Sequence, residues 1–313
     1  MSARNTLLDG MRVLDAGIWR PVPHATQLLA DLGATVLKVE PPGGDPMRHF
    51  PDIFDDVAAG KRSVVVDLKT DAGRELVLEL AHDADVFAEG WRPGVAQRLG
   101  VGYDDVRAVN PSIIYGSLSG FGQTGPLAAV PGHDLNYQAR AGALVRSAHD
   151  ESPTIPILPV ADLAGATMLA LAVCAAWARK LQTGEGEYVD VSMTDVVATW
   201  RGNRSHVRVA GRDQPSGGSA GYGVFRCADG VFVTLAVIAE DHFWTAVCDA
   251  LGLDDVRTVA YAERLGRVPE LNGRVADALS TMAGIGASNS AAVLACMRFS
   301  ASPAQAPVAT IPI

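Results

Sequence analysis

Short apolar runs alternate with helical patterns through the first part of the chain. Between these runs, the spacing of apolar residues predicts helices over residues 24–32, 71–81 and 104–109, the first of them ended by Gly33. Strands that alternate with helices indicate βαβ units, which build a parallel sheet. We therefore predict an α/β fold here. The runs predicted as strands are MRVL (11–14), TVLKVE (35–40), SVVVDL (63–68), ADVFAE (84–89), SIIYGS (112–117) and YVDVS (188–192).

Residues 162–183 show the clearest long helical pattern. Asp162 is a favourable N-cap for this helix, and Gly184 is a favourable residue just past its end. The helix is apolar nearly all round, so we expect it to be buried. Its uncharged stretch, residues 163–178, is shorter than the roughly 20 residues that cross a bilayer, so we expect no membrane partner.

The pattern changes after a Gly/Ser-rich stretch near residue 220. The run YGVFRC-ADG-VFVTLAV predicts a β-hairpin, and residues 241–251 predict a helix. From residue 284 the chain is Ala/Ser-rich and weakly patterned. We predict a large domain over residues 1–210, a linker over 211–221 and a smaller α+β domain over 222–313.

The composition narrows the classes of function. The chain has 313 residues and a net charge of −9, which argues against a nucleic-acid partner. An anionic ligand must therefore be held by local Arg and Lys side chains. The opening residues contain no apolar h-region, and the cysteines form no C-x-x-C pair, so we expect a cytoplasmic protein with reduced thiols. These cysteines are Cys174, Cys227, Cys248 and Cys296.

Several familiar motifs are absent or lie in the wrong context. GGSAG (217–221) fits the serine-hydrolase pattern G-x-S-x-G, but a polar loop precedes it and a hairpin follows, so a Gly-rich loop is the better interpretation. The stretch AGIWRPVPH after the first strand lacks G-x-G-x-x-G. No Walker A, H-E-x-x-H or zinc-like spacing occurs. We therefore expect no metal and no prosthetic group.

Three segments place ionisable residues in unusual company. GHDLNY contains His133 and Asp134, PVADLAG contains Asp162, and AEDHFW contains Glu240. Each residue has a plain structural explanation when taken singly. Asp162 can serve as a helix cap, His133 as a loop histidine, and Glu240 as a carboxylate favoured at a helix start.

A series of longer stretches, in order along residues 9–255, carries a more specific signal. It resembles family III of the CoA-transferases (CaiB/BaiF), which also contains the α-methylacyl-CoA racemases. The resemblance implies a Rossmann-like large domain, a small domain, an interlocked homodimer, and coenzyme A bound as part of an acyl-CoA substrate. The stretches are DGMRVLD, LLADLGATVLKVEPPGGDPMR, GKRSVVVDLKTDAGRELVLELAHDADVFAEGWRPGVAQRLGVG, NPSIIYGSLSGFGQTGP, GHDLNY, ADLAG, TGEGEYVDVSM and ADGVFVTLAV.

The resemblance implies two possible chemistries for Asp162. In the transferases the matching aspartate attacks the acyl-CoA, forms a mixed anhydride, and is then thioesterified by the CoA thiolate. In the racemases it exchanges a proton with Cα, a histidine matching His133 acts from the opposite face, and a glutamate matching Glu240 partners it. Free N–H groups at the helix start are expected to stabilise the enolate oxygen.

Because all three residues are present, we predict a 2-methylacyl-CoA racemase or epimerase. Inversion of a carbon acid needs two groups that hold different protonation states at one pH. A CoA-transferase that uses Asp162 as its nucleophile is the alternative. An inactive CoA-binding remnant is a second alternative, because the chain is shorter at its C-terminus than family members usually are.

Coenzyme A contacts are carried over to residues that mostly follow predicted strands. Ligands bind at the carboxyl ends of strands in α/β sheets, although any single Arg or Lys is also explained as a solvated surface charge. One departure is Pro41, which stands where many family members carry Arg, and another is an extra residue in AGIWRPVPH relative to the racemases. The predicted contacts are Trp19, Arg20, Lys69, Gly90, Trp91, Arg92, Arg98 and Tyr137.

Overall fold

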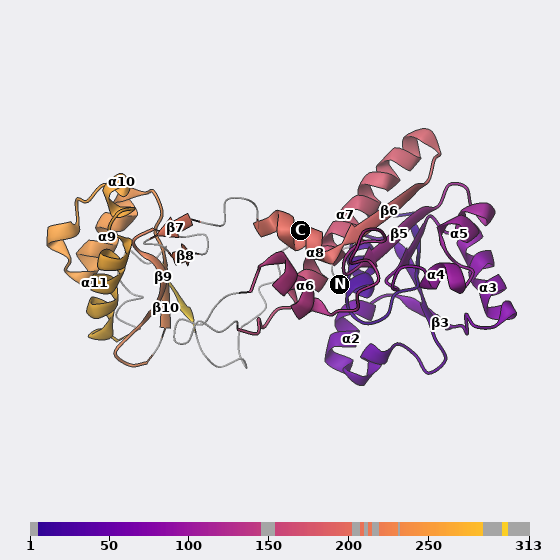
Figure 1. Cartoon of the computed structure of the whole chain (residues 1–313), viewed down its shortest axis with the longest axis horizontal. Coiled ribbons are helices and arrows are strands. Elements are labelled where there is room, and N and C mark those ends of the chain that lie inside the picture. The colour runs from indigo at the N-terminus through magenta and orange to yellow at the C-terminus, as the bar shows by residue number, and fades with distance from the viewer. Residues whose placement is uncertain are drawn as a thin grey trace. The chain divides into compact units, whose positions relative to one another are not determined.

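The computed structural model describes residues 6–144, 154–201, 207–209, 212–214, 219–230, 232–283 and 296–299. The chain divides into two compact units, Met1–Gly202 and Asn203–Ile313 (Figure 1). Each unit has a hydrophobic core of its own.

A six-stranded parallel sheet forms the centre of the first unit. Its strand order is β3-β2-β1-β4-β5-β6, and Val13 of β1 pairs with Val36 of β2 and Val86 of β4. This is the order of a doubly wound sheet, in which the winding reverses between β1 and β4. The prediction of a Rossmann-like α/β fold is confirmed. The strands are β1 (Arg12–Asp15), β2 (Thr35–Glu40), β3 (Arg62–Val65), β4 (Val86–Glu89), β5 (Ile114–Ser119) and β6 (Glu187–Ser192).

Helices cover both faces of this sheet. Val13 faces a core built with α1, α6, α7 and α8, whereas the next residue, Leu14, faces a core built with α3 and α5. This alternation follows from the pleat of a strand, and burial on both faces explains why the strands are continuous apolar runs. The helices are α1 (Pro21–Asp31), η1 (Pro46–His49), α2 (Pro51–Ala58), α3 (Asp71–His82), α4 (Val95–Arg98), α5 (Tyr103–Val109), α6 (Asp134–Ala141), α7 (Val160–Thr183) and α8 (Met193–Arg201).

Helix α1 begins earlier than predicted. Its first residue is Pro21, not His24, and its last is Asp31. Proline is favoured in the first turn of a helix because its φ is already suitable and its missing N–H has no partner to lose there. The early start places Arg20 at the N-cap position, directly after the loop that leaves β1.

Helix α7 is buried on one face only, so the expectation of burial all round is wrong. Small residues such as Ala164 and Gly165 lie against the sheet, whereas Leu171 and Leu181 are 62% and 69% exposed. The helix is long and apolar enough to cross a membrane by length and composition, with a mean hydropathy of 1.7. Leu169 packs over Gly116 of β5, which is the position of a core helix in a doubly wound unit.

The second unit contains the predicted hairpin. Strands β9 and β10 pair antiparallel, with Val233 opposite Phe225, and Gly230 in the connecting turn has a φ of 79°. Strand β11 pairs with β10, although its sequence lies in the stretch predicted to be weakly patterned. Part of the predicted linker, and Gly217 and Gly218 of GGSAG, lie outside the described residues. The elements are β7 (Val207–Val209), β8 (Arg212–Gln214), β9 (Tyr222–Arg226), β10 (Phe232–Ala236), α9 (Asp241–Leu251), η2 (Asp254–Val256), α10 (Tyr261–Arg264), α11 (Val268–Ser280) and β11 (Cys296–Phe299).

Candidate active site

Two loops meet at the point where the winding of the sheet reverses. Strands β1 and β4 are hydrogen-bonded neighbours, so the loops at their carboxyl ends lie side by side. Both loops approach Val22 at the start of α1: an added Cβ would lie 2.4 Å from Val22 Cβ at Gly17, and 3.0 Å from Val22 Cγ2 at Gly90. Open α/β sheets bind ligands at this position. The loops carry five of the predicted coenzyme A contacts, namely Trp19, Arg20, Gly90, Trp91 and Arg92.

The remaining two cationic contacts, Lys69 and Arg98, are not part of these two loops. Lys69 is exposed in the connection after β3, which is the edge strand and is separated from β1 by β2. Arg98 is exposed at the end of α4. Its Nη1 nevertheless lies over the loop after β4, 3.2 Å from where a Cβ on Gly94 would be. The contact of Lys69 and Arg98 with coenzyme A stays a prediction.

Asp162 lies inside the first turn of α7 and does not cap it. The helix begins at Val160, and a residue from α6 takes the capping position instead. Oδ1 of Asp134 accepts hydrogen bonds from the backbone N–H groups of Ala161, at 2.7 Å, and of Asp162, at 3.1 Å. The interpretation of Asp162 as a plain N-cap is therefore wrong. The Asp162 carboxylate does not cap the helix and has no hydrogen bond to any other described residue.

The start of α7 does not offer free N–H groups to a ligand. Asp134 occupies those of Ala161 and Asp162, while Val160 N donates to Leu158 O at 2.9 Å and Leu163 N to Pro159 O at 3.0 Å. The expectation that these amides stabilise an enolate oxygen is wrong for this arrangement. The N-cap residue is Pro159, which has no N–H, and the N–H groups of Val160, Ala161 and Asp162 already have acceptors.

The surroundings of Asp162 raise the pKa of its carboxyl group towards neutral pH. Burial and the nearby negative charge of Asp134 raise the pKa of Asp162, Arg20 lowers it, and the result is a pKa of about 7. Desolvation and a like charge both disfavour the ionised form of a carboxyl group. A carboxyl group with a pKa near 7 can both give and take a proton under ordinary conditions.

Tyr137 joins Asp162 to the loop after β4. Its ring occupies the space beside Gly120, where an added Cβ would lie 2.2 Å from Tyr137 Cε1, and its hydroxyl donates to Gly132 O at 2.5 Å. Burial raises the pKa of Tyr137, Asp162 raises it further, and Arg92 lowers it. The charges of Asp162 and Arg92 therefore both act on Tyr137, although the three residues are far apart in the sequence.

His133 is the N-cap residue of α6 and is exposed. Its backbone N–H donates to Asn136 Oδ1 at 3.0 Å, and this bond fixes the start of the helix. The following residue is Asp134, whose carboxylate binds the first turn of α7. The structure thus places the His133 backbone one residue away from the group that touches Asp162.

Glu240 belongs to the second unit, where it is the N-cap residue of α9. Its Oε2 accepts a hydrogen bond from Ile238 N at 3.2 Å, so the side chain folds back over the end of its own strand connection. The structure describes Glu240 within this unit alone. Its partnership with His133 stays a prediction.

Sequence reasoning missed Glu89, the last residue of β4. Burial raises the pKa of Glu89 to about 7, and its two oxygens accept hydrogen bonds from Ser117 Oγ at 2.5 Å and from Trp91 N at 2.7 Å. The side chain therefore ties the turn that carries Trp91 to β5. Its position at the end of an apolar strand, just before Gly90, was the signal that could have found it.

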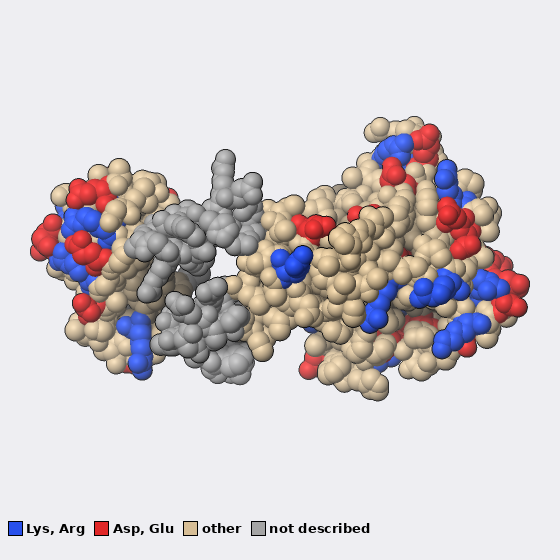
Figure 2. Space-filling view, in the orientation of Figure 1, with Lys and Arg blue, Asp and Glu red and all other residues tan. Residues whose placement is uncertain are grey.

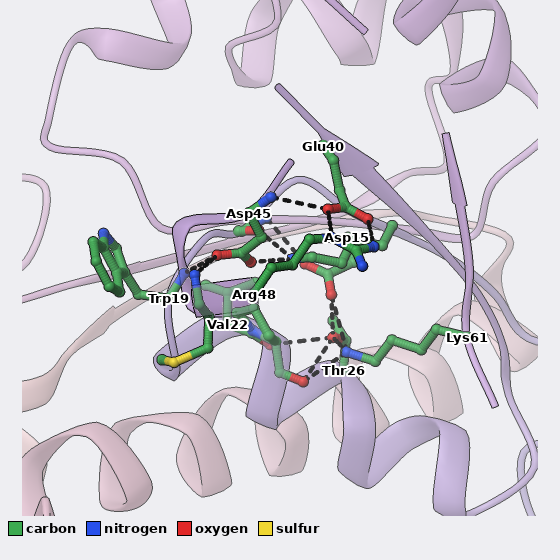
Figure 3. A network of polar contacts seen from close by, with 12 residues as sticks. Asp15, Trp19, Val22, Thr26, Glu40, Asp45, Arg48 and Lys61 are labelled. Atoms are coloured by element: carbon green, nitrogen blue, oxygen red, sulfur yellow. Dashed lines mark hydrogen bonds and ion pairs between the residues drawn. The ribbon is translucent and has the colours of Figure 1, made fainter. Parts of the chain in front are cut away.

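A network of buried charges below the loop after β1 was also missed (Figure 3). Lys61 Nζ lies 3.0 Å from Asp15 Oδ2, and Lys38 Nζ lies 2.8 Å from Asp45 Oδ2, with all four side chains nearly inaccessible to water. Burial alone would raise the pKa of Asp15, but the Lys61 and Lys38 ammonium groups outweigh it and lower this pKa. Buried pairs persist when further hydrogen bonds satisfy them, and Thr26 Oγ1 supplies one to Asp15 at 2.7 Å.

The ionisable groups at the candidate site are carboxyl, imidazole and guanidinium groups, which can transfer protons or bind anions. Within the part of the chain that the structure describes, no group of three or more His, Cys, Asp or Glu side chains is arranged to hold a metal ion. Cys174, Cys227 and Cys248 are free thiols. Figure 2 shows cationic and anionic side chains interspersed on the visible face of the first unit.

Comparison with known proteins decides the family. Residues 8–309 match the model of the family described as CoA-transferase family III. The chain belongs to CoA-transferase family III. It is 34% identical to an acetyl-CoA:oxalate CoA-transferase of Acetobacter aceti, over 80% of this chain and 68% of the relative. It is also 34% identical to the alpha-methylacyl-CoA racemase of Homo sapiens, over 79% of this chain and 65% of the relative.

Solved structures of family members share the fold. A crystal structure of Rv3272 from Mycobacterium tuberculosis matches with a TM-score of 0.79 and 32% identity, over 90% of this chain and 80% of that one. A CaiB/BaiF family protein from Brucella suis matches with a TM-score of 0.75 and 28% identity, over 89% of this chain and 79% of that one. The predicted resemblance is confirmed, and the named relatives include both CoA-transferases and a racemase.

Proposed function

We propose that this member of CoA-transferase family III is a 2-methylacyl-CoA racemase or epimerase, in which Asp162 exchanges a proton with Cα of the acyl thioester. The observation that carries the proposal is the pKa of Asp162, which burial raises to about 7. Proton transfer is most effective when the pKa of the catalytic group lies near the working pH. A carboxyl group of ordinary pKa would remain ionised and would be a poor proton donor.

His133 supplies the second proton-transfer group in this mechanism. One of the two groups removes the Cα proton, the electron pair moves onto the thioester oxygen as an enolate, and the other group returns a proton to the opposite face. The substrate loses and gains one proton, so no other reactant is needed. Glu240 is proposed to orient His133, as the resemblance implies. The backbone link from His133 through Asp134 to Asp162 supports the pairing of the two groups.

Coenzyme A is proposed to bind at the two loops that follow β1 and β4. Arg20 and Arg92 supply positive charge there in a chain whose net charge is −9. Both charges affect the site around Asp162. Arg20 lowers the pKa of Asp162 itself, and Arg92 lowers the pKa of the neighbouring Tyr137. Lys69 and Arg98 are proposed as outer phosphate contacts. No prosthetic group is part of this proposal.

A CoA-transferase is the second candidate, because relatives named as CoA-transferases are 34–36% identical to this chain over 80–83% of its length, at least as similar as the racemase at 34% over 79%. Here the Asp162 carboxylate attacks the thioester carbonyl, releases the CoA thiolate and forms a mixed anhydride. The thiolate then attacks the aspartyl carbonyl, which releases the first acid and leaves an aspartyl-CoA thioester for the second acid. The lack of a hydrogen bond to the Asp162 carboxylate among the described residues suits such an attack.

A homodimer is proposed from the exposed apolar surface of the first unit. Ile155 and Ile157, just before α7, are 81% and 94% exposed, and Leu171 lies exposed on α7 itself. Large apolar side chains that are this exposed are candidates for an interaction surface. Ile157→Asp with Leu171→Lys should lower the molecular mass in sedimentation equilibrium to that of a monomer, whereas an unchanged mass contradicts the proposal.

One experiment separates racemase, transferase and inactive remnant. The protein is incubated in deuterated water with a single enantiomer of a 2-methylacyl-CoA, with and without a free carboxylic acid. Deuterium at Cα together with loss of optical purity, without any acceptor acid, supports the racemase. Substrate that stays unlabelled while CoA appears on the added acid supports the transferase and overturns the leading proposal. Neither change, with CoA still bound, supports the remnant.

A further inference from the structure

The backbone of Trp19 has an unusual conformation. Its φ is +63°, in the left-handed region, which bulky side chains rarely adopt. Such a conformation persists only where the surrounding structure determines it, and it is often found where a site is preorganised. Trp19 lies in the loop between β1 and α1, and its side chain is 43% exposed. A large apolar ring is thus held outward by an unfavourable backbone.

Asp45 holds this backbone in place (Figure 3). Its Oδ1 accepts a hydrogen bond from Trp19 N at 3.1 Å and another from Met47 N at 2.9 Å. Its Oδ2 lies 2.8 Å from Lys38 Nζ, which also donates to Gly17 O at 2.7 Å. The ion pair therefore binds the loop backbone on both sides of Ile18, at Gly17 O through Lys38 and at Trp19 N through Asp45.

The ion pair has little freedom to move. The side chains of Lys38 and Asp45 are 3% and 0% exposed, and Lys38 projects from β2, which is hydrogen-bonded to β1. Glu40 Oε2, at the end of the same strand, accepts a hydrogen bond from Asp45 N at 2.9 Å and another from Arg48 Nε at 2.7 Å. Both the backbone and the side chain of Asp45 are consequently fixed to the sheet.

The loop that Asp45 fixes leads directly to the candidate active site. The residue after Trp19 is Arg20, which is the N-cap residue of α1 and whose charge lowers the pKa of Asp162. Movement of the Trp19 amide would therefore move both an exposed ring at the carboxyl edge of the sheet and a cation that acts on Asp162.

We propose that Asp45 is a positioning residue for acyl-CoA, which it serves by fixing the left-handed backbone of Trp19 so that the Trp19 ring contacts the bound thioester. The proposal rests on the proposed acyl-CoA site. It assigns Trp19 a direct contact with the ligand and assigns Asp45, with Lys38, an indirect role through the loop.

A matched pair of double variants tests the role of Asp45 without leaving a buried charge unpaired. Lys38→Met/Asp45→Asn removes both charges but keeps an oxygen that can accept from Trp19 N. Lys38→Met/Asp45→Ala removes both charges and that acceptor. The dissociation constant of acetyl-CoA is measured for both by titration calorimetry. We expect the alanine variant to bind about tenfold more weakly than the asparagine variant, which is the loss typical of one good binding contact.

A double-mutant cycle separates positioning from a general structural role. Trp19→Gly removes the ring, and glycine adopts the left-handed conformation without strain. We expect this variant to stay folded and to bind acetyl-CoA about tenfold more weakly. In the Trp19→Gly background, the difference between the alanine and asparagine variants at position 45 should vanish. The proposal is overturned if that difference persists unchanged, or if Trp19→Gly binds acetyl-CoA as tightly as wild type. The measurement on Trp19→Gly can be made even if the alanine variant does not fold.

Lys180→Met is the control for loss of a partly buried ion pair elsewhere. Lys180 Nζ lies 3.0 Å from Asp85 Oδ1, and Asp85 immediately precedes β4, at the opposite edge of the sheet from the loop of Trp19. This variant should lose thermal stability and keep its affinity for acetyl-CoA. Wild-type protein that binds no acetyl-CoA contradicts the proposed function as well. Wild-type binding with additive effects at positions 19 and 45 contradicts the positioning role alone.

Discussion

Asp15 and Asp162 are both largely buried carboxyl groups near the carboxyl edge of one sheet, yet their pKa values shift in opposite directions. Asp15 is surrounded by Lys61 and Lys38, whose positive charges lower its pKa against the effect of burial. Asp162 has the carboxylate of Asp134 beside it, so burial and a like charge act together and raise its pKa to about 7. Burial disfavours the ionised form of both groups, and the sign of the neighbouring charges decides whether that effect is reversed.

The comparison also separates structural from chemical tasks. The Asp15 carboxylate accepts hydrogen bonds from Thr26, Lys61 and the backbone of Gly17, so its oxygens are engaged. The Asp162 carboxylate has no such partner among the residues described. A carboxyl group that is both unengaged and poised near neutral pH is suited to act on a ligand, whereas an engaged one holds the fold together.

The largest expected effect is on catalysis. Asp162→Asn should lower the turnover number at least about a thousandfold, as is typical when the central group of a mechanism is removed. Turnover is measured by deuterium exchange at Cα and by CoA transfer to an added acid. Asp71→Asn is the matched control, because Asp71 lies in the first turn of α3 and is exposed. Full activity in Asp162→Asn would remove Asp162 from both mechanisms.

The next effect is on stability and concerns Asp15. Lys61→Met should lower the free energy of unfolding by about 3–5 kcal/mol, because it leaves a buried carboxylate without its main cation. Urea denaturation at pH 7 measures the loss. Since the folded-state pKa of Asp15 is lowered, its contribution to wild-type stability is present above its ordinary pKa and is lost as the pH falls through the folded value. A loss no larger than that of Arg74→Met, which breaks an exposed pair with Asp71, would contradict this account.

The pH dependence of activity tests the neighbours of Asp162. Asp134→Asn keeps an oxygen for the α7 amides but removes the negative charge, so the pKa of Asp162 should fall. Arg20→Gln removes a positive charge, so this pKa should rise. Each shift should be on the order of one pH unit. Activity against pH measures both, and shifts of the same sign in the two variants would be inconsistent with electrostatic control.

The smallest effect is a gain in stability from Asp162→Asn at alkaline pH. The folded-state pKa of Asp162 is raised, so its ionisation destabilises the folded protein as the pH rises from about 4 to about 7. The asparagine variant lacks this penalty and should be more stable than wild type at pH 8 by on the order of 2 kcal/mol, with a smaller gain at pH 4.5. Urea denaturation at both values checks the difference. Equal gains at both would point to packing instead of charge.

Local patterns predicted much of the fold. The bounds of β2 and α9 agree with the prediction, because apolar spacing and turn residues specify such elements over a few positions. The start of α7 was misplaced because its cap comes from Asp134, 28 residues earlier in the chain. Residues of a helix start can be satisfied by any acceptor nearby in space, and a local pattern does not include such a partner.

Most residues of the candidate site were predicted from the sequence, but their hydrogen bonds, ion pairs and pKa values were not. His133, Asp162 and the residues after β1 and β4 came from the sequence and from its resemblance to the family. Lys38 was overlooked because a lysine in a strand is normally expected to be exposed. Its burial depends on the ion pair with Asp45, which the local pattern does not include. Glu89 was overlooked because its place at the end of an apolar strand indicates only its position, whereas its hydrogen bond from Ser117 comes from another strand.

By itself, the sequence determined the parallel α/β unit, the family and the placement of Asp162 at the start of a long helix. The tertiary structure decided which carboxyl groups are ionised, which amides are free and which loop is held under strain. The physical reason is that pKa values and hydrogen bonds depend on atoms within a few ångströms. For Asp15 the decisive partner, Lys61, is 46 residues away along the chain, and only folding brings the two together.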